Sequence, residues 1–218
     1  MPCGAFSAQA LPPEASVVKR LFDIVGAALA LAVLSPLLLL VAARIKLDSP
    51  GPVFFRQERV GRHGVPFRIH KFRTMKHGAP GLQITVGADP RITHVGVWLR
   101  RTRVDELPQF IDVLQGAMSL VGPRPEVPRY VLHYPPALRD IVLAVRPGIT
   151  DPASLGALDE SQQLARAADP EREYVERILP AKLQASADYA AQASLRSDLA
   201  VLLRTMGRLL GANHDRPA

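Results

Sequence analysis

A stretch without a single charged side chain, residues 24–43, constrains this chain more than any other feature. It reads IVGAALALAVLSPLLLLVAA. A helix of about 20 residues covers the hydrocarbon core of a bilayer, which is ~30 Å thick. A helix of a soluble protein normally keeps a polar face, and this stretch has none. The sequence therefore predicts a membrane helix, which we extend with its flanks to residues 19–46.

Two features of this helix concern its topology. Basic residues flank the apolar stretch on both sides: Lys19, Arg20, Arg44 and Lys46. The positive-inside rule places both ends on the cytoplasmic side. Ser35 and Pro36 lie near the middle, where proline removes a backbone N–H and bends the helix, and the serine hydroxyl can bind the freed carbonyl of Ala32. We expect the helix to bend at Ser35 and Pro36 and return to the same face; the alternative is a single crossing helix that tolerates a proline.

The remaining residues predict one domain with an α+β, mostly helical fold. Residues 1–18 form a flexible leader, residues 47–211 form the domain, and residues 212–218 form a tail. Strand-like runs at residues 53–58 and 67–71 enclose two glycines, which predicts a β-hairpin. Residues 76–88 read as a loop.

Helices are predicted for the second half of the chain. Thr93 is the expected N-cap of a short helix, and a second helix is expected from Asp105 to its closing Gly116. The apolar face of this second helix is expected to hold Leu107, Phe110, Ile111 and Leu114. The chain from about residue 161 to residue 211 reads as helical. The apolar residues of its last helix share one face, which suits either core packing or a position on a lipid surface. They are Leu199, Leu202, Leu203, Met206 and Leu210.

Two adjacent acids, Asp105 and Glu106, have two interpretations. The structural one is a helix start: acids in the first turn interact favourably with the helix dipole, and Thr102 with Asp105 resembles a capping box. The chemical one is that the two side chains, which point about 100° apart on a helix, serve two roles at a reaction site. The surrounding arginines, Arg100 and Arg103 among them, would keep such carboxylates ionised and attract phosphate.

Two proline-bounded arginines and one basic segment support the chemical interpretation. Arg124 lies in VGPRPE, Arg146 lies in VRPGIT, and Lys71 and Arg73 lie in KFRTM. A guanidinium held between prolines costs little backbone entropy to position, and its planar fork suits phosphate. Each loop alone is also compatible with a solvated surface turn. Together they predict a phosphate-handling surface.

The composition narrows the class of partner. The formal net charge of +7 and the pI near 10.1 indicate an anionic partner. Aromatic residues make up only 6% of the chain, which argues against the stacking surfaces of a nucleic-acid-binding module. The single cysteine, Cys3, excludes an internal disulfide. A membrane helix, a carboxylate pair and phosphate-binding arginines together indicate phosphoryl transfer onto a lipid. A membrane-tethered binding module and a hydrolase of lipid diphosphates remain the alternatives.

The order of motifs resembles a known family. The segments are KRLFDIVGA, SPG, VFFRQERVG, FRIHKFRTM, DPRIT, LRRTRVDELPQ, VLQGAMSLVGPRPE and VRPGIT. This series, over residues 19–152, is similar to the bacterial sugar transferases, the small monotopic phosphoglycosyl transferases. The resemblance implies transfer of a sugar 1-phosphate from a nucleoside diphosphate sugar, usually UDP-linked, to polyprenyl phosphate with release of UMP. It also implies a covalent aspartyl intermediate and Mg²⁺ as cofactor.

The resemblance assigns roles to the residues singled out above. Asp105 is expected to be the nucleophile and Glu106 its partner, and both are expected to hold the metal. The expected substrate-binding residues are Arg100, Lys71, Arg73, Arg124 and Arg146. The family has a re-entrant helix with a Ser-Pro bend, which favours the returning topology at Ser35 and Pro36.

The resemblance further implies a bacterial inner membrane protein on the cytoplasmic face. Its partners would be a nucleoside diphosphate sugar, polyprenyl phosphate and membrane lipids, with no nucleic acid, in the first membrane step of polysaccharide or glycoconjugate assembly. One departure limits this inference. Many members follow RPGIT with a Gly-Trp-Ala-Gln run, whereas Thr150 is followed here by DPASLGALDE. The sugar therefore cannot be read from this loop, and the oligomeric state stays open, with a homodimer as one option.

Overall fold

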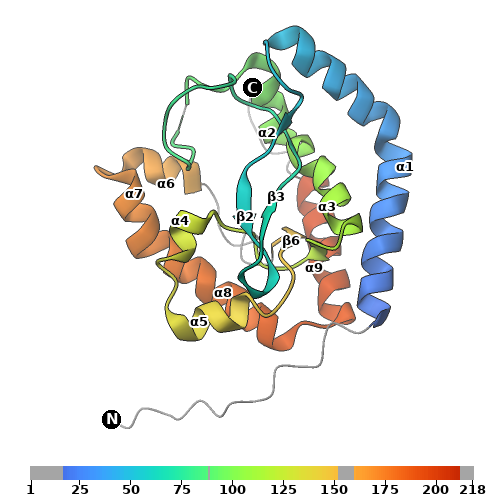
Figure 1. Cartoon of the computed structure of the whole chain (residues 1–218), viewed down its shortest axis with the longest axis vertical. Helices are drawn as coiled ribbons and strands as arrows, with labels where there is room; N and C mark the ends of the chain where they lie inside the picture. The colour runs from blue at the N-terminus through green and yellow to red at the C-terminus, as the bar shows by residue number, and fades with distance from the viewer. Residues whose placement is uncertain (1–16, 88, 152–159, 212–218) are drawn as a thin grey trace.

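The structure, a computed structural model, describes residues 17–87, 89–151 and 160–211. The expected leader up to residue 16, the expected tail at 212–218 and residues 152–159 after Thr150 lie outside the described residues. In the described ranges the chain is mostly helical with short strands, as an α+β fold requires (Figure 1).

The elements follow one another along the chain. The helices are α1 (Val17–Asp48), η1 (Arg62–Gly64), α2 (His94–Thr102), η2 (Val104–Gln109), α3 (Phe110–Leu114), α4 (Pro128–Val131), α5 (Pro136–Val142), α6 (Glu160–Arg166), α7 (Pro170–Glu173), η4 (Tyr174–Ile178), α8 (Leu179–Gln192) and α9 (Leu195–Gly211). The strands are β1 (Phe54–Phe55), β2 (Glu58–Val60), β3 (Pro66–Arg68), β4 (Lys71–Phe72), β5 (Ser119–Val121) and β6 (Gly148–Thr150).

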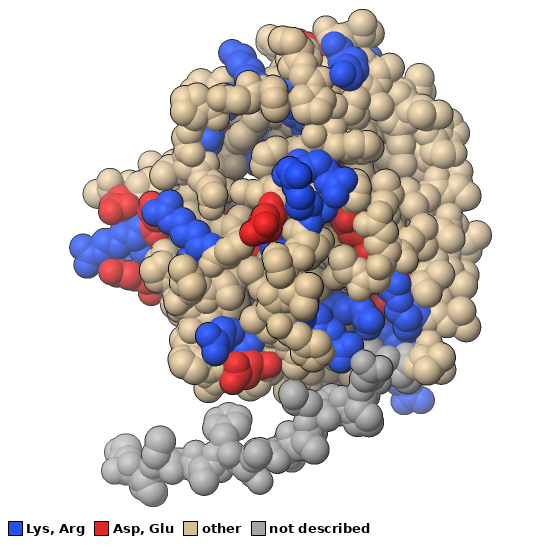
Figure 2. All heavy atoms as spheres, in the orientation of Figure 1, with Lys and Arg blue, Asp and Glu red and all other residues tan. Residues whose placement is uncertain are grey.

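Helix α1 runs without a break through Pro36 and is long and apolar enough to enter a membrane. Only 11% of its most apolar window is buried in the protein. The Ser35 hydroxyl donates to the carbonyl of Ala32 over 2.8 Å, as expected for the carbonyl that proline leaves free. Figure 1 shows α1 along one side of the molecule and bending over one end. Figure 2 shows few charged side chains along this edge, with basic ones toward its ends.

The N-terminal end of α1 is fixed to the domain by polar contacts. The Lys19 ammonium pairs with the buried carboxylate of Asp198 in α9. Asp23 accepts hydrogen bonds from the Ser119 hydroxyl at 2.8 Å and the Leu120 backbone N–H at 3.1 Å, both in β5. Buried charges are tolerated only when paired in this way, so these contacts define where the helix begins to leave the domain.

The C-terminal end of α1 is fixed to the same domain. The Arg73 guanidinium donates to the carbonyls of Ser49 and Pro50, each over 2.7 Å. The Asp48 carboxylate accepts from the Val95 backbone N–H of α2 at 3.3 Å. A buried apolar cluster lies beneath these bonds: Val41, Ile45, Phe72 and Leu99. Both ends of α1 therefore rest on one domain, and the exposed apolar middle lies between them.

The predicted hairpin is present, but its first strand is interrupted. Strand β2 pairs antiparallel with β3, and β1 pairs separately with β4, so the run at 53–58 divides into two short strands. Figure 1 shows the β2–β3 hairpin at the centre of the molecule. Strands β5 and β6 pair in parallel, where a Cβ on Gly148 would lie 2.0 Å from the Gly122 nitrogen. Only glycine permits this close approach.

The helix around the acidic pair differs from the prediction. Thr93 caps α2 as expected, accepting from the Gly96 N–H at 3.0 Å. The predicted helix from 105 to 116 is instead the 3₁₀ segment η2 followed by the short helix α3. Arg103 ends α2 in the left-handed region at φ 60°, so Thr102 belongs to the preceding helix and donates back to the Trp98 carbonyl at 2.9 Å. The predicted capping box is therefore wrong.

The change of helix type also shifts which side chains are buried. A 3₁₀ turn has three residues instead of 3.6, so positions counted along an α-helix fall out of register after it. Val113 is fully buried while Leu114, expected on the apolar face, is 39% exposed. In α9, Val201 is buried, whereas Leu199 and Leu203 of the expected face are exposed. Val201 of α9 and Val113 of α3 belong to the same buried cluster.

Gly96 provides a test of the packing of α2. A Cβ at Gly96 would lie 2.0 Å from the Thr74 carbonyl oxygen, and this backbone atom belongs to the segment that follows β4. We expect Gly96→Ala to lower the free energy of unfolding by about 1–3 kcal/mol, measured by chemical denaturation in detergent. Gly207 of α9 is the control, because a Cβ there meets nothing within 4 Å and alanine favours the helix. Equal stability of wild type and Gly96→Ala would contradict this packing.

Candidate active site

The acidic pair is buried at the start of η2. Asp105 is 2% exposed and Glu106 is 8% exposed. Both carboxylates meet one ammonium group: Lys71 Nζ lies 2.9 Å from Asp105 Oδ2 and 3.2 Å from Glu106 Oε1. Lys71 comes from β4, which packs closely on η2. The structure thus brings together three of the residues that the sequence indicated, across 34 positions of the chain.

Glu106 carries further cationic partners. Arg124 Nη2 lies 2.6 Å from Glu106 Oε1, and Arg103 Nη1 lies 3.9 Å from the same atom. Burial by itself would raise the pKa of Glu106, but the charges of Arg124 and Lys71 outweigh it and hold the pKa well below its ordinary value. The carboxylate of Glu106 also raises the pKa of the Arg124 guanidinium. Glu106 is therefore ionised at neutral pH.

The proline-bounded loop that carries Arg124 is held from two directions. Arg59 of β2 donates to the Pro125 carbonyl at 3.0 Å, and the Val60 N–H donates to the Glu126 carbonyl at 2.9 Å. The buried Glu126 side chain accepts a short hydrogen bond from the Tyr174 hydroxyl. Burial and the nearby Glu126 charge raise the pKa of Tyr174, so this hydroxyl keeps its proton. The C-terminal helices thus help to place Arg124.

Two buried polar atoms in the candidate site have no hydrogen-bond partner: Asp105 Oδ1 and Arg100 Nη1. The other terminal nitrogen of Arg100 donates to the Thr85 hydroxyl at 2.7 Å. Burial lowers the pKa of Arg100, and the charge of Asp105 opposes this shift, which places the two groups within electrostatic reach. Buried polar atoms without partners are costly unless a ligand satisfies them. A carboxylate oxygen and a guanidinium N–H suit a cation and a phosphate respectively.

The carboxylate pair fits a magnesium ion bound through substrate. Within the described ranges, no group of three or more His, Cys, Asp or Glu side chains is arranged to hold a metal. Mg²⁺ needs no such cage, because it is usually held by one or two carboxylates, water and substrate phosphates. Asp105 and Glu106 supply two adjacent carboxylates, and one Asp105 oxygen has no protein partner.

Two predicted substrate-binding residues make other contacts. The buried Arg73 guanidinium holds the end of α1, as described above, so its contacts give it a structural role and do not support substrate binding. Arg146 Nε donates a hydrogen bond to the Gly116 carbonyl at 3.0 Å. This bond connects the segment before β6 to the segment after α3. These contacts do not join Arg73 and Arg146 to Asp105.

Sequence reasoning missed several residues that support the site. Arg103 was read only as part of a basic surrounding, and Glu126 and Tyr174 were not singled out. His70, next to Lys71, contacts Asp112 Oδ1 through Nδ1 at 2.6 Å and also donates its backbone N–H to Oδ2 at 2.8 Å. No sequence pattern reveals the His70–Asp112 and Glu126–Tyr174 pairs, because their members lie 42 and 48 positions apart.

Comparisons with known proteins show the family of this chain. The profile of the family described as bacterial sugar transferase matches residues 14–212. The chain therefore belongs to the bacterial sugar transferase family.

Individual relatives are enzymes named for phosphosugar transfer. A UDP-glucose:undecaprenyl-phosphate glucose-1-phosphate transferase of Caulobacter vibrioides is 41% identical over 88% of this chain and 69% of its own length. A protein of the same name from Escherichia coli is 42% identical over 73% of this chain and 36% of its own length. An Aeromonas hydrophila relative is 46% identical over 63% of this chain and 34% of its own length. It is named a UDP-N-acetylgalactosamine-undecaprenyl-phosphate N-acetylgalactosaminephosphotransferase. The chain thus spans about a third of the length of the latter two relatives.

The depressed pKa of Glu106 gives a pH-dependent prediction. Ionised Glu106 stabilises the folded state above its unfolded pKa of about 4.3, and this contribution is lost as the pH falls through the lower folded pKa. Arg124→Met removes a main cause of the low pKa, so we expect the free energy of unfolding to fall by about 3 kcal/mol at pH 7. The deficit should shrink toward pH 4, where the variant can protonate Glu106.

Chemical denaturation at pH 7, 5 and 4 measures this change. Arg139→Met, at an exposed arginine of α5, is the control and should show little effect at any pH. A deficit of Arg124→Met that is independent of pH would contradict the proposed coupling to Glu106.

Proposed function

We propose that this protein transfers a sugar 1-phosphate from a UDP-sugar to undecaprenyl phosphate and releases UMP. The observation that carries the proposal is the buried Asp105, which has one oxygen held by Lys71 and the other without a partner. Membership of the family and the names of the relatives support the substrate classes. The relatives differ in their sugar, glucose or N-acetylgalactosamine, so the sugar is left open here.

The proposed reaction uses Oδ1 of Asp105, the oxygen without a protein partner. Oδ1 attacks the phosphorus that carries the sugar, and the bond from this phosphorus to the bridging oxygen breaks. The electron pair leaves with that oxygen on UMP, and an acyl phosphate that joins Asp105 to the phosphosugar remains. A phosphate oxygen of undecaprenyl phosphate then attacks the same phosphorus, which frees the carboxylate and forms the lipid diphosphate sugar. Two displacements replace one difficult transfer, as in other covalent mechanisms.

The cations around the pair stabilise the charge of these steps. Lys71 fixes the orientation of Asp105, and Arg100 is placed to bind a donor phosphate through its unpartnered Nη1. Glu106, with its low pKa, is a poor proton acceptor, so its proposed role is to hold Lys71 and Arg124 in position. Mg²⁺, held by Asp105 and Glu106, would neutralise charge on the donor diphosphate.

We further propose that α1 is a re-entrant helix on the cytoplasmic face of the bacterial inner membrane. Both of its ends bind one domain, through Lys19 and Asp23 at one end and through Asp48 at the other. A helix that crossed the bilayer would place its ends on opposite sides, so this docking supports a return to the same face. The basic residues at both ends favour the cytoplasmic side.

Asp105→Asn tests the catalytic proposal. The amide cannot form the acyl phosphate, so we expect UMP release to fall by about 10³-fold or more while membrane attachment persists. The assay combines membranes or purified protein with Mg²⁺, undecaprenyl phosphate and a panel of UDP-sugars. Asp140→Asn, at an exposed carboxylate of α5, is the control and should keep full activity.

A labelled donor distinguishes the proposed transferase from a hydrolase and from a binding module. Trapping during turnover with a labelled donor should place the phosphosugar on Asp105, and label on Glu106 or on no residue would overturn the role assignment. Release of free phosphosugar without lipid acceptor would indicate the hydrolase instead. A binding module would show no turnover in any variant.

Single cysteines test the topology in a Cys3→Ser background. Val17→Cys and Leu47→Cys mark the two ends of α1, and Leu132→Cys marks the domain; these side chains are 86%, 79% and 85% exposed. We expect all three to react with an impermeant maleimide from one side of the membrane only, since both helix ends rest on the domain. Pro36→Leu removes the proline bend and should move a fraction of Val17→Cys to the opposite side. Labelling of the two wild-type helix ends from opposite sides would refute the returning topology.

A further inference from the structure

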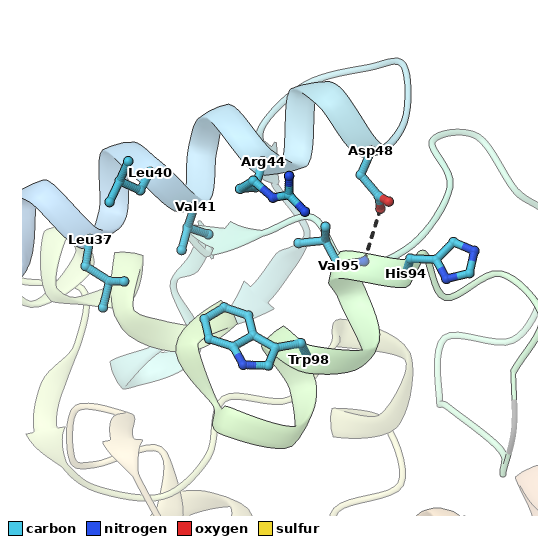
Figure 3. Close-up of a pocket in the computed structure, with 8 residues that line it drawn as sticks. All are labelled: Leu37, Leu40, Val41, Arg44, Asp48, His94, Val95 and Trp98. Atoms are coloured by element: carbon cyan, nitrogen blue, oxygen red, sulfur yellow. Dashed lines mark hydrogen bonds between the residues drawn. The ribbon is translucent and has the colours of Figure 1, made fainter.

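A groove lies between the C-terminal half of α1 and α2, outside the carboxylate cluster. It encloses about 450 Å³. Its walls are mostly apolar, with Leu37, Leu40 and Val41 from α1 and Val95 and Trp98 from α2. Figure 3 shows the Trp98 indole across the gap from Leu37 and Val41. The two helices thus form an apolar channel that the domain itself does not fill.

The groove opens on the surface that α1 presents to lipid. Leu40 is 67% exposed and Trp98 is 47% exposed. A tryptophan at such a site is typical of the membrane interface, where its ring lies among apolar chains and its N–H meets water. A ligand that enters from the bilayer therefore reaches the groove without crossing water.

One end of the groove is polar and carries a cation without a partner. Asp48 accepts a hydrogen bond from the Val95 N–H in the first turn of α2, where the helix dipole also offsets its charge. Among the described residues, no hydrogen bond or ion pair engages the Arg44 guanidinium, which lies beside Val95 in Figure 3. An apolar channel that ends at a free guanidinium matches an amphiphile with an anionic phosphate head.

Helix α2 separates the groove from the candidate active site. Trp98 faces the groove, and Arg100, two positions further along the helix, lies about 200° away around its axis, toward Asp105. The buried Leu99 packs between them against α1. The groove and the carboxylate cluster therefore share one wall, and a lipid held in the groove is near the site but outside it.

We infer that this groove is the entry site for the acceptor lipid: the isoprenoid chain of undecaprenyl phosphate lies along Trp98, and its phosphate pairs with Arg44. The inference rests on the proposed function for the identity of the lipid. Phosphatidate shares the phosphate head but has two acyl chains in place of one isoprenoid chain, so it serves as the competing lipid in the test. Binding at Arg44 precedes the transfer at Asp105 and needs no donor.

Trp98 is the only tryptophan of the chain, so its fluorescence reports on the groove directly. The experiment titrates undecaprenyl phosphate into the Asp105→Asn protein in phosphatidylcholine nanodiscs, where no turnover occurs. We expect a saturable change in Trp98 emission, weaker binding of undecaprenol, and roughly tenfold weaker binding to Arg44→Gln, as for the loss of one charge-assisted hydrogen bond. Lys46→Gln removes a cation from the same helix end outside the groove lining and should bind like its parent.

Steady-state kinetics supply a second measurement. Trp98→Ala should raise the KM for undecaprenyl phosphate several-fold and leave the KM for the UDP-sugar unchanged, while the control Val97→Ala should change neither. Three results would overturn the inference: no saturable change in emission, an equal response to phosphatidate, or equal losses in Arg44→Gln and Lys46→Gln. If the proposed function is wrong, the wild-type protein shows no turnover with any donor. The emission titration measures lipid binding without turnover, so the two failures can be distinguished.

Discussion

Two adjacent buried carboxylates are the central physical constraint on this structure. Asp105 and Glu106 would repel each other and lose hydration in a site that is 2% and 8% exposed. Lys71 bridges the two carboxylates, and Arg124 binds Glu106 and helps to hold the pKa of that carboxyl well below its ordinary value. The surrounding architecture places these cations: β4 carries Lys71, and the proline-bounded loop carries Arg124. The small sheets matter less for their own stability than for bringing basic residues to η2 from distant parts of the chain.

The same segments also connect the site to the membrane helix. Strand β4 contributes Lys71 to the acids, and two residues later Arg73 binds the carbonyls at the end of α1. Helix α2 contributes Arg100 to the site, while its first turn binds Asp48 of α1. In each case only a few residues separate the side chain at the site from the residue that contacts α1. Short segments of β4 and α2 therefore connect the acids to the C-terminal end of α1.

Sequence patterns predicted the features that depend on local order. The apolar stretch around Pro36 predicts α1 and the Ser35 bond to Ala32 because both follow from helix geometry. The Thr93 cap follows likewise from residue type and position. The 3₁₀ turn at the acids was missed because Arg103 adopts a left-handed conformation that a non-glycine residue rarely takes. Residue propensities therefore do not indicate a left-handed turn at an arginine.

The site itself was predicted in part for the same reason. Charge and proline spacing mark Lys71 and Arg124 in the sequence, and the family resemblance adds Arg100, but the pattern treats every arginine in a basic segment alike. Arg73 shares the KFRTM segment with Lys71 and points to backbone carbonyls instead. Alternation along an extended segment sends residues 71 and 73 to the same face, so spacing alone would group them. What separates them is the helix end that happens to lie over Arg73, a contact 24 positions away in the chain.

The depth of Asp105 bears on the choice between transfer and hydrolysis. An acyl phosphate on an exposed aspartate would be hydrolysed, because water molecules greatly outnumber any lipid acceptor. Asp105 is 2% exposed, and Lys71 contacts one of its oxygens. Access to the phosphorus of the proposed intermediate would therefore be limited to groups that fit the site. In the proposed mechanism, an acceptor bound in the groove across α2 would approach such a site from the lipid side and not from bulk water. Burial of the nucleophile and an apolar route for the acceptor are thus two parts of one requirement for lipid-directed transfer.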